Sequence, residues 1–238
     1  MLKLDREGER FVFENDWDVL IPAEIEQTPE KGLVLTVIPL LRDVGKRFLS
    51  LYSARPFARE ALTWLRDEIA PRCAERGYLT SRFSVRHCRI LRFPEGETPH
   101  SPLPGGRVLV AADEARNRTT FDLAETVSDG RLCFGQIDGG KVVSVAVTHA
   151  SPDKREPGGP LEIGVETIPG AQRRGYAVSC LSGLTAMVLS RGLIPEYRCT
   201  FSNVASAKTA RAAGYLQIGE ACSLVLRRAA RRPTTTDF

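Results

Sequence analysis

The hydrophobic positions of residues 107–228 alternate between strand-like and helix-like spacing. Short stretches rich in Val, Ile and Leu, which are typical of strands, cover residues 107–112, 131–137, 141–149, 161–168 and 196–201. Apolar side chains recur at helical intervals in residues 113–127, 172–192 and 203–214. One or two further strands follow from Tyr215. This order predicts an α/β fold in which a mixed sheet carries helices.

Residues 1–106 follow a less regular α+β pattern. Residues 10–21, 31–40 and 81–93 are typical of strands, and residues 56–77 are typical of a helix that Pro71 should kink or divide. Prolines and glycines then crowd residues 94–106 and interrupt regular structure. We therefore predict an N-terminal accessory region at 1–106, a second domain at 107–228 and a flexible basic tail at 229–238.

Composition narrows the class of protein. The chain has 238 residues, of which 42% are hydrophobic, and no apolar run is long enough for a membrane helix. The first ten residues are charged and do not resemble a secretory signal, so we expect a cytoplasmic protein. Residues 1–106 carry equal numbers of acidic and basic side chains, so the net charge of +4 lies in residues 107–238. That charge suits an anionic ligand but is too weak to indicate nucleic-acid binding.

Cysteine and histidine spacing gives no sign of a metal site. The six cysteines form no CxxC pair, and the three histidines are scattered. Without a secretory route, disulfides are not expected. Cys180 lies on the apolar stripe of its predicted helix, so we interpret it as a core residue and not as a nucleophile.

The segment from Pro169 to Ala177, between a strand and a long helix, is suited to an anion. The first backbone N–H groups of a helix lack intrahelical partners and lie at the positive end of its dipole. Gly175 and Ala177 are small enough for a phosphate to approach the backbone. Arg173 and Arg174 add charge, and Gln172 can hold the turn through side-chain hydrogen bonds. The alternative is an ordinary strand–helix connection; neither GxGxxG nor a nucleotide P-loop is present.

Within this segment, Gln172-Arg173-Arg174-Gly175-Tyr176-Ala177 resembles the [QR]-x-x-G-x-[GA] motif of the GNAT (Gcn5-related) N-acetyltransferases. Asn203 and Gly214-Tyr215 match two later positions of the family pattern in order and spacing. Residues 161–177 also look like a bacterial subgroup of the family. The resemblance covers residues 107–228, about half of the chain.

The resemblance implies a sheet that splays open between strands 161–168 and 196–201, with acetyl-CoA in the gap. The pantetheine would pair with backbone around Glu166–Ile168, the pyrophosphate would lie on the N–H groups of 173–177, and Asn203 would help to orient the pantetheine. No metal is implied. The implied cofactor contacts are Thr167, Ile168, Gln172, Arg173, Arg174, Gly175, Tyr176, Ala177 and Asn203.

Two carboxylates are candidates for the base that deprotonates an acceptor amine. Glu162 and Glu166 are four residues apart, which puts both on one face of a regular strand. A carboxylate partly removed from water there suits proton transfer from an ammonium group. The alternatives are that one or both pair with arginine or face solvent, or that a bulge changes their faces. His149, at the end of its strand, is a further candidate.

The general acid is in doubt because the family commonly places a tyrosine seven residues after the Asn, where this chain has Ala210. The resemblance implies an N-acetyltransferase that transfers acetyl from acetyl-CoA to an amine, which we expect to be a small molecule. One alternative is a non-catalytic acyl-CoA-binding or sensing protein. Another is an interaction protein whose basic tail binds an acidic partner. Residues 1–106 would shape the acceptor cleft, form a homodimer contact or be a degenerate second GNAT half.

Overall fold

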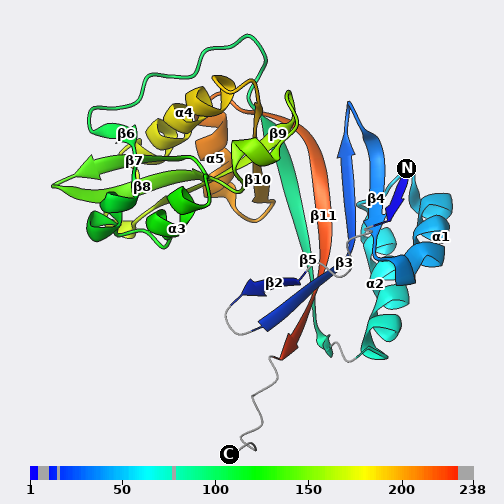
Figure 1. The fold of residues 1–238 in the computed structure, drawn as a ribbon. Coiled ribbons are helices and arrows are strands. Elements are labelled where there is room, and N and C mark those ends of the chain that lie inside the picture. Colours follow the sequence, from blue (N-terminus) through cyan, green and yellow to red (C-terminus); the bar gives the residue numbers. More distant parts are fainter. Residues whose placement is uncertain (5–10, 15–16, 77–78, 230–238) are drawn as a thin grey trace, which may run out of the picture. The chain divides into compact units, whose positions relative to one another are not determined.

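A computed structural model describes residues 1–4, 11–14, 17–76 and 79–229. The predicted tail therefore lies outside the described residues except for Ala229, and so does Gly77 at the end of the predicted helix 56–77. Contacts divide the chain into two compact units, Met1–Cys88 with Gly219–Phe238, and Arg89–Ile218. Two long strands, β5 (Leu79–Arg92) and β11 (Leu216–Ala229), contribute residues to both (Figure 1).

The first unit is a sheet with two helices. Its other strands are β1 (Leu2–Leu4), β2 (Phe11–Glu14), β3 (Trp17–Thr28) and β4 (Gly32–Val37). Helices α1 (Arg42–Tyr52) and α2 (Arg59–Ala74) follow. The strand order is β1-β4-β3-β11-β5, with β2 on β3, and β1 and β4 run parallel.

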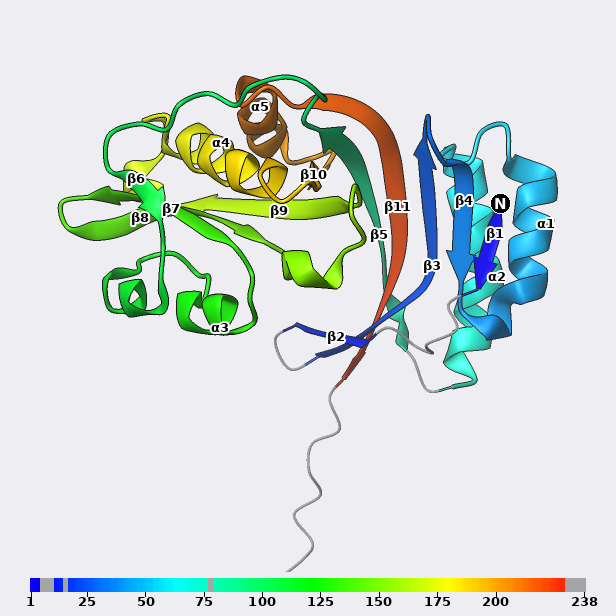
Figure 2. The same ribbon diagram turned by 45° about the horizontal axis from the view of Figure 1, so that its top comes forward.

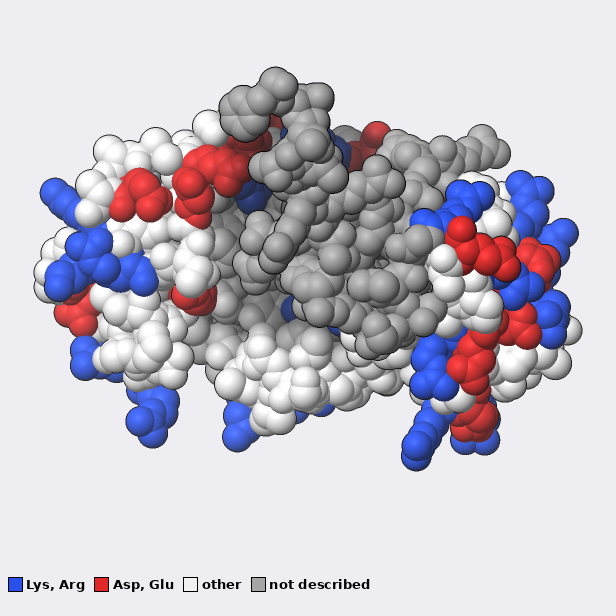
Figure 3. Space-filling view, turned by 90° about the horizontal axis from the view of Figure 1, so that it is seen from below, with Lys and Arg blue, Asp and Glu red and all other residues white. Residues whose placement is uncertain are grey.

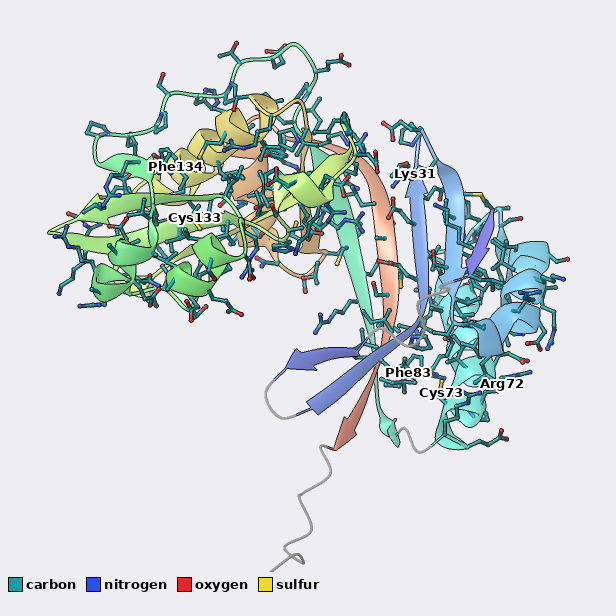
Figure 4. The ribbon with its side chains drawn as sticks, in the orientation of Figure 1. Lys31, Arg72, Cys73, Phe83, Cys133 and Phe134 are labelled. Carbon is teal, nitrogen blue, oxygen red and sulfur yellow. The ribbon has the colours of Figure 1, made fainter. Side chains whose placement is uncertain are left out.

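The core of this unit lies between the sheet and the two helices. Ala61, Leu65 and Ile69 of α2 are fully buried, as the helical spacing predicted. Figure 4 labels Arg72 and Cys73, neighbours on α2, of which Cys73 is buried in the core. Acidic and basic side chains are interspersed over the outer surface of α1 and α2 (Figure 3), where ion pairs join Glu68 to Arg47 and Arg72.

The structure of this unit differs from the sequence prediction in three places. The predicted strand 10–21 is divided between β2 and β3, which pair antiparallel. Helix α1 was not predicted. Helix α2 is not divided at Pro71, because the residue lies inside its last turn and the helix continues to Ala74.

The second unit, Arg89–Ile218, contains most of the predicted domain 107–228. Its strands are β6 (Gly106–Val108), β7 (Cys133–Asp138), β8 (Lys141–Thr148), β9 (Pro160–Thr167) and β10 (Ile194–Thr200). Its α-helices are α3 (Leu123–Ser128), α4 (Tyr176–Leu189) and α5 (Val204–Ala212). The strand order is β5-β10-β9-β8-β7-β6; β9 and β10 are parallel and β6 to β9 antiparallel. The predicted mixed α/β sheet is confirmed.

Helices cover both faces of this sheet (Figure 2). Helices α4 and α5 pack on one face, where Cys180, Leu181 and Leu184 of α4 are fully buried. Helix α3 lies on the other face, over a smaller cluster. Because side chains alternate along a strand, the neighbours Cys133 and Phe134 of β7, labelled in Figure 4, belong to these two different clusters.

The largest correction in this unit concerns residues 107–127. The predicted strand 107–112 shortens to β6, and the predicted helix 113–127 becomes a 3₁₀ helix (Ala111–Arg116) and the short α3. The Asn117 side chain bonds to the backbone of Thr119 and Phe121, and Asp122 caps α3 by accepting from the Glu125 N–H. Asn and Asp favour such local bonds over a continuous helix. Helix α4 is also shorter than the predicted 172–192.

Asp113 in the 3₁₀ helix should make the protein sensitive to acid. Both of its carboxylate oxygens accept from Arg107, at 2.6 and 2.9 Å, and one also accepts from the Val110 N–H. The Arg107 hydrogen bonds lower the pKa of Asp113 from its usual 3.8. A lowered folded-state pKa gives stability that is complete above the unfolded value and is lost as the pH falls through the folded one.

We therefore expect Asp113→Asn to cost about 1–3 kcal/mol of unfolding free energy at pH 7. The difference from the unsubstituted protein should shrink below pH 4. Urea unfolding measured from pH 7 to pH 2 checks this, and a difference that stays constant over that range would contradict it.

Candidate active site

Strands β9 and β10 pair over only half of β9. Their paired residues run from Ile194 opposite Pro160 to Tyr197 opposite Ile163. Strand β9 continues to Thr167, still paired with β8 on its other side. Its second half therefore presents an open edge where β10 has diverged, which confirms the expected splay.

The ladder with β8 identifies which backbone groups face this open edge. His149 N–H donates to Glu162 C=O, and Ile168 N–H donates to Val143 C=O. Antiparallel strands use alternate residues for these bonds, so Glu162, Gly164, Glu166 and Ile168 turn their backbone groups to β8. The intervening Val165 and Thr167 turn theirs to the open edge.

This alternation refines the expected backbone contacts. Of Glu166, Thr167 and Ile168, only Thr167 faces the edge. Both backbone groups of Ile168 are occupied, since its C=O also accepts from the Ala171 N–H. Val165 was missed, although the period of two along a strand was enough to find it.

The expected anion loop lies at the end of the same strand. A 3₁₀ turn (Pro169–Ala171) leads to Gly175, which is the N-cap of α4 and has a left-handed φ of 80°. Arg173 is also left-handed, with φ 62°, which is uncommon for a residue with a side chain. The loop approaches α4 in an irregular path that exposes its backbone.

The backbone N–H groups of residues 173–178 donate to no other group within the part of the chain that the structure describes. The first of these bonds along the helix is made by Ser179, to the Gly175 C=O. Unpaired N–H groups at a helix N-terminus form an anion-binding concavity. The loop therefore has the geometry expected of a phosphate site.

The loop side chains hold this backbone in place. The Gln172 amide donates to the Thr167 C=O at 3.3 Å, which confirms its expected role in holding the turn. Arg174 pairs with Asp138 at 3.0 Å, and the Tyr176 hydroxyl donates to the same carboxylate at 3.2 Å. Arg173 is exposed beside them.

The proline-rich segment 94–105 lies beside the first turn of α4 (Figure 2). Leu103 N–H donates to the Ser179 hydroxyl at 2.9 Å, and the buried Gln136 donates to the Pro104 C=O at 2.6 Å. A side-chain carbon at Gly175 would lie 3.4 Å from the Leu103 methyl. The sequence predicted only a boundary here, because a contact between residues 72 positions apart has no local signal.

Glu162 and Glu166 share one face of β9 and make different contacts. Leu161, Ile163 and Val165 pack toward α4, so the two carboxylates lie on the opposite face. Glu162 lies 3.3 Å from His149 Nδ1 and 3.7 Å from Arg198 Nε. Glu166 accepts two bonds from Thr120, from its N–H at 3.0 Å and its hydroxyl at 2.6 Å.

A buried ion-pair group lies next to Glu162. Glu196 of β10 is only 3% exposed. It accepts from Arg198 Nε at 2.9 Å and from Arg92 Nη2 at 3.2 Å. Glu196 lies opposite Glu162 in the register between the two strands. This group fixes Arg198 beside Glu162, so the alternative of pairing with arginine applies to Glu162.

No tyrosine occupies the position of the family's general acid. Ala210 is fully buried in α5. The hydroxyls of Tyr197 and Tyr215 are bonded to Ser206 and Thr185, both at 2.7 Å, and burial raises the pKa of both phenols. Neither phenol is exposed to a ligand.

Two further residues considered from the sequence, Asn203 and Cys180, have structural contacts in the fold. Asn203 is the N-cap of α5, where its side chain accepts from the Ser206 N–H at 3.0 Å. Cys180 is fully buried, which raises the pKa of its thiol to about 11 and leaves it unsuited to act as a nucleophile.

Within residues 1–4, 11–14, 17–76 and 79–229, no three His, Cys, Asp or Glu side chains are grouped to hold a metal ion. None of the helices described there has the length and apolar character that a membrane crossing requires.

Comparison with known proteins identifies the fold. A family model described as GNAT acetyltransferase matches residues 123–221. No curated protein matches the chain. A GCN5-related N-acetyltransferase-like protein from Streptococcus suis has a TM-score of 0.51 at 16% identity, over 90% of this chain and 89% of that one.

Other solved structures match a smaller share. A GNAT-family acetyltransferase from Colwellia psychrerythraea has a TM-score of 0.47 at 13% identity, over 67% of this chain. A structure from Novosphingobium aromaticivorans has a TM-score of 0.49 at 20% identity, over 60% of this chain. This chain spans 60% and 65% of those two proteins, less than two thirds of either. Residues 123–221 thus match the model of the GNAT acetyltransferase family, and the Streptococcus suis protein shares the fold.

Proposed function

We propose that the chain is an N-acetyltransferase that transfers an acetyl group from acetyl-CoA to an amine. The observation that carries the proposal is the open edge of β9 running directly into the unpaired N–H groups before α4. An extended amide chain could pair with the edge as an added strand does. A pyrophosphate could then bind the N–H groups at the end of that edge.

The residues present fit acetyl-CoA in three respects. The Val165 N–H and C=O and the Thr167 N–H could pair with the two amides of a pantetheine, while the Thr167 C=O already accepts from Gln172. The N–H groups of residues 173–178 and the exposed Arg173 offer donors and charge to phosphate. Asn203, Arg174, Tyr176 and Ala177 remain proposed contacts, of which Arg174 would exchange Asp138 for phosphate.

When bound, acetyl-CoA supplies a thioester whose carbonyl carbon an amine can attack. The part of this chain is to hold the thioester at the splay, to deprotonate the amine and to exclude competing water. Glu162 and Glu166 are the carboxylates of β9 on the face away from α4, and with His149 they are the candidates for this deprotonation. With Ala210 in place of a tyrosine, the thiolate would leave without a protein acid or take its proton from water.

The test is release of free thiol from acetyl-CoA with a panel of amines. Spermidine, lysine, glutamate, kanamycin and a peptide with a free N-terminus represent the acceptor classes that this fold could serve. We expect thiol release that depends on one of them and a product heavier by one acetyl group.

A second candidate function is acyl-CoA binding without catalysis. It is favoured by the buried Ala210 and by the buried, hydrogen-bonded hydroxyls of Tyr197 and Tyr215. Tight acetyl-CoA binding with no thiol release across the whole panel would support the sensor and contradict the enzyme.

A further inference from the structure

On the face of β9 away from α4, three titratable side chains could accept a proton, and their contacts differ. Glu166 accepts two hydrogen bonds from Thr120, on the segment between the 3₁₀ helix 111–116 and α3. The Glu166 carboxylate therefore already accepts two hydrogen bonds that hold the loop, which makes it less available to accept a proton. Glu162 faces a histidine and an arginine. His149, half exposed, is the most accessible of the three.

The His149 ring lies against the strand at the point where the splay begins. A side-chain carbon at Gly164 would come within 2.8 Å of His149 Nε2 and 3.7 Å of the Phe121 ring. Gly164 directly follows Ile163, the last residue of β9 that pairs with β10. The missing side chain at Gly164 therefore makes room for the imidazole beside the first unpaired residues of the open edge.

The two nitrogens of His149 have different surroundings. Nδ1 lies 3.3 Å from the Glu162 carboxylate. Nε2 makes no hydrogen bond or ion pair within the described residues, and it lies toward Gly164. A carboxylate beside Nδ1 favours the tautomer with its proton there, which leaves a lone pair on Nε2.

We propose that His149 accepts the proton of the acceptor amine on Nε2, with Glu162 as the positioning residue that holds its tautomer and Glu166 as a clamp for the 117–122 segment. This inference rests on the proposed acetyltransferase function and assigns the base within it. The charged group beside His149 is Glu162 on β9. Ion pairs connect Glu162 in turn to Arg198 and Glu196 on β10 and to Arg92 on β5.

The proton and electron balance of the step is complete. His149 Nε2 takes one proton from the acceptor ammonium, which gives the free amine. The amine nitrogen forms a bond to the thioester carbon, the C–S bond breaks, and the sulfur leaves with the electron pair. The nitrogen then sheds a second proton, which ends on the thiolate. The products are the amide, the free thiol and protonated His149, which returns its proton to solvent.

The kinetic test compares His149→Ala with His100→Ala, which removes an exposed histidine from the 94–105 segment. The acceptor is the panel amine that the unsubstituted protein uses fastest. We expect His149→Ala to lower kcat about 100-fold at pH 7 with little change in the Kd for acetyl-CoA. The loss should shrink at high pH, where solvent deprotonates the amine, and added imidazole should restore part of it. His100→Ala should keep full activity.

A second measurement does not depend on activity. The imidazole ¹⁵N shifts of His149 should report a proton on Nδ1 in the unsubstituted protein, and Glu162→Gln should weaken that preference. Glu162→Gln should lower kcat about 10-fold, less than His149→Ala does.

The outcomes separate this inference from the proposed function. If the unsubstituted protein turns over and His149→Ala stays within twofold of it, the base assignment is overturned while the acetyltransferase stands. A proton on Nε2 would overturn the role given to Glu162. No thiol release from the unsubstituted protein with any amine would overturn the function itself and the base assignment with it.

Discussion

Gly175→Glu should weaken acetyl-CoA binding by at least about 100-fold, which corresponds to ~2.7 kcal/mol. The new carboxylate would lie among the N–H groups before α4, where it would fill the space for phosphate and repel it. Gly175 has a left-handed φ of 80°, which strains any residue with a side chain. A loss of affinity could therefore also come from this backbone strain, so a control variant is needed. Calorimetric titration with acetyl-CoA measures the effect.

A matched control exists at the other end of α4. Gly192 is also left-handed, with φ 68°, and a side-chain carbon there meets nothing within 4 Å. Gly192→Glu therefore introduces the same charge and the same kind of strain away from the loop. We expect it to leave acetyl-CoA affinity unchanged. Equal losses in the two variants, or none in either, would remove the anion-site assignment.

Glu196→Ala should cost about 3 kcal/mol of unfolding free energy. Removing the carboxylate leaves Arg92 and Arg198 close together without their shared partner, and breaking a buried ion pair costs 3–5 kcal/mol. The side chains of Arg92 and Arg198 are 15% and 22% exposed. Because water can partly solvate them, the lower end of that range applies.

Urea unfolding at pH 7 checks this value against Glu156→Ala, which removes an exposed glutamate from the loop before β9 and should stay within about 0.5 kcal/mol. A loss below 1 kcal/mol for Glu196→Ala would mean that the two arginines find other partners or water. We also expect Glu196→Ala to release Arg198 from beside Glu162. The kcat of the folded variant should then change as well.

The sequence was most informative where the structure depends on local patterns. Apolar periodicity predicted β7, β8, β9, β10, α4 and α5, and the Gln172–Ala177 motif predicted the loop before α4 with the hydrogen bond of Gln172. These features depend on neighbours in the chain. The alternation that turns Val165 to the open edge is equally local, although the expected contacts Glu166–Ile168 did not include this residue.

The parts that the sequence did not predict depend on distant contacts. Thr120 reaches Glu166 across 46 positions, and Leu103 reaches Ser179 across 76. The 3₁₀ helix and α3 stand in place of the predicted helix 113–127 because the side chains of Asn117 and Asp122 bond to nearby backbone. The spacing of apolar residues carries no information about such bonds. The approach of His149 to Gly164 required the ladder between β8 and β9.

Amide hydrogen exchange followed by NMR, with and without acetyl-CoA, tests the central claim most directly. Acetyl-CoA along the open edge of β9 and before α4 should protect the Val165 and Thr167 amides and those of residues 173–178. The Glu162, Gly164 and Glu166 amides, which already face β8, should change little. No protection at the edge and the loop at saturating acetyl-CoA, or protection confined to another surface, would contradict the account.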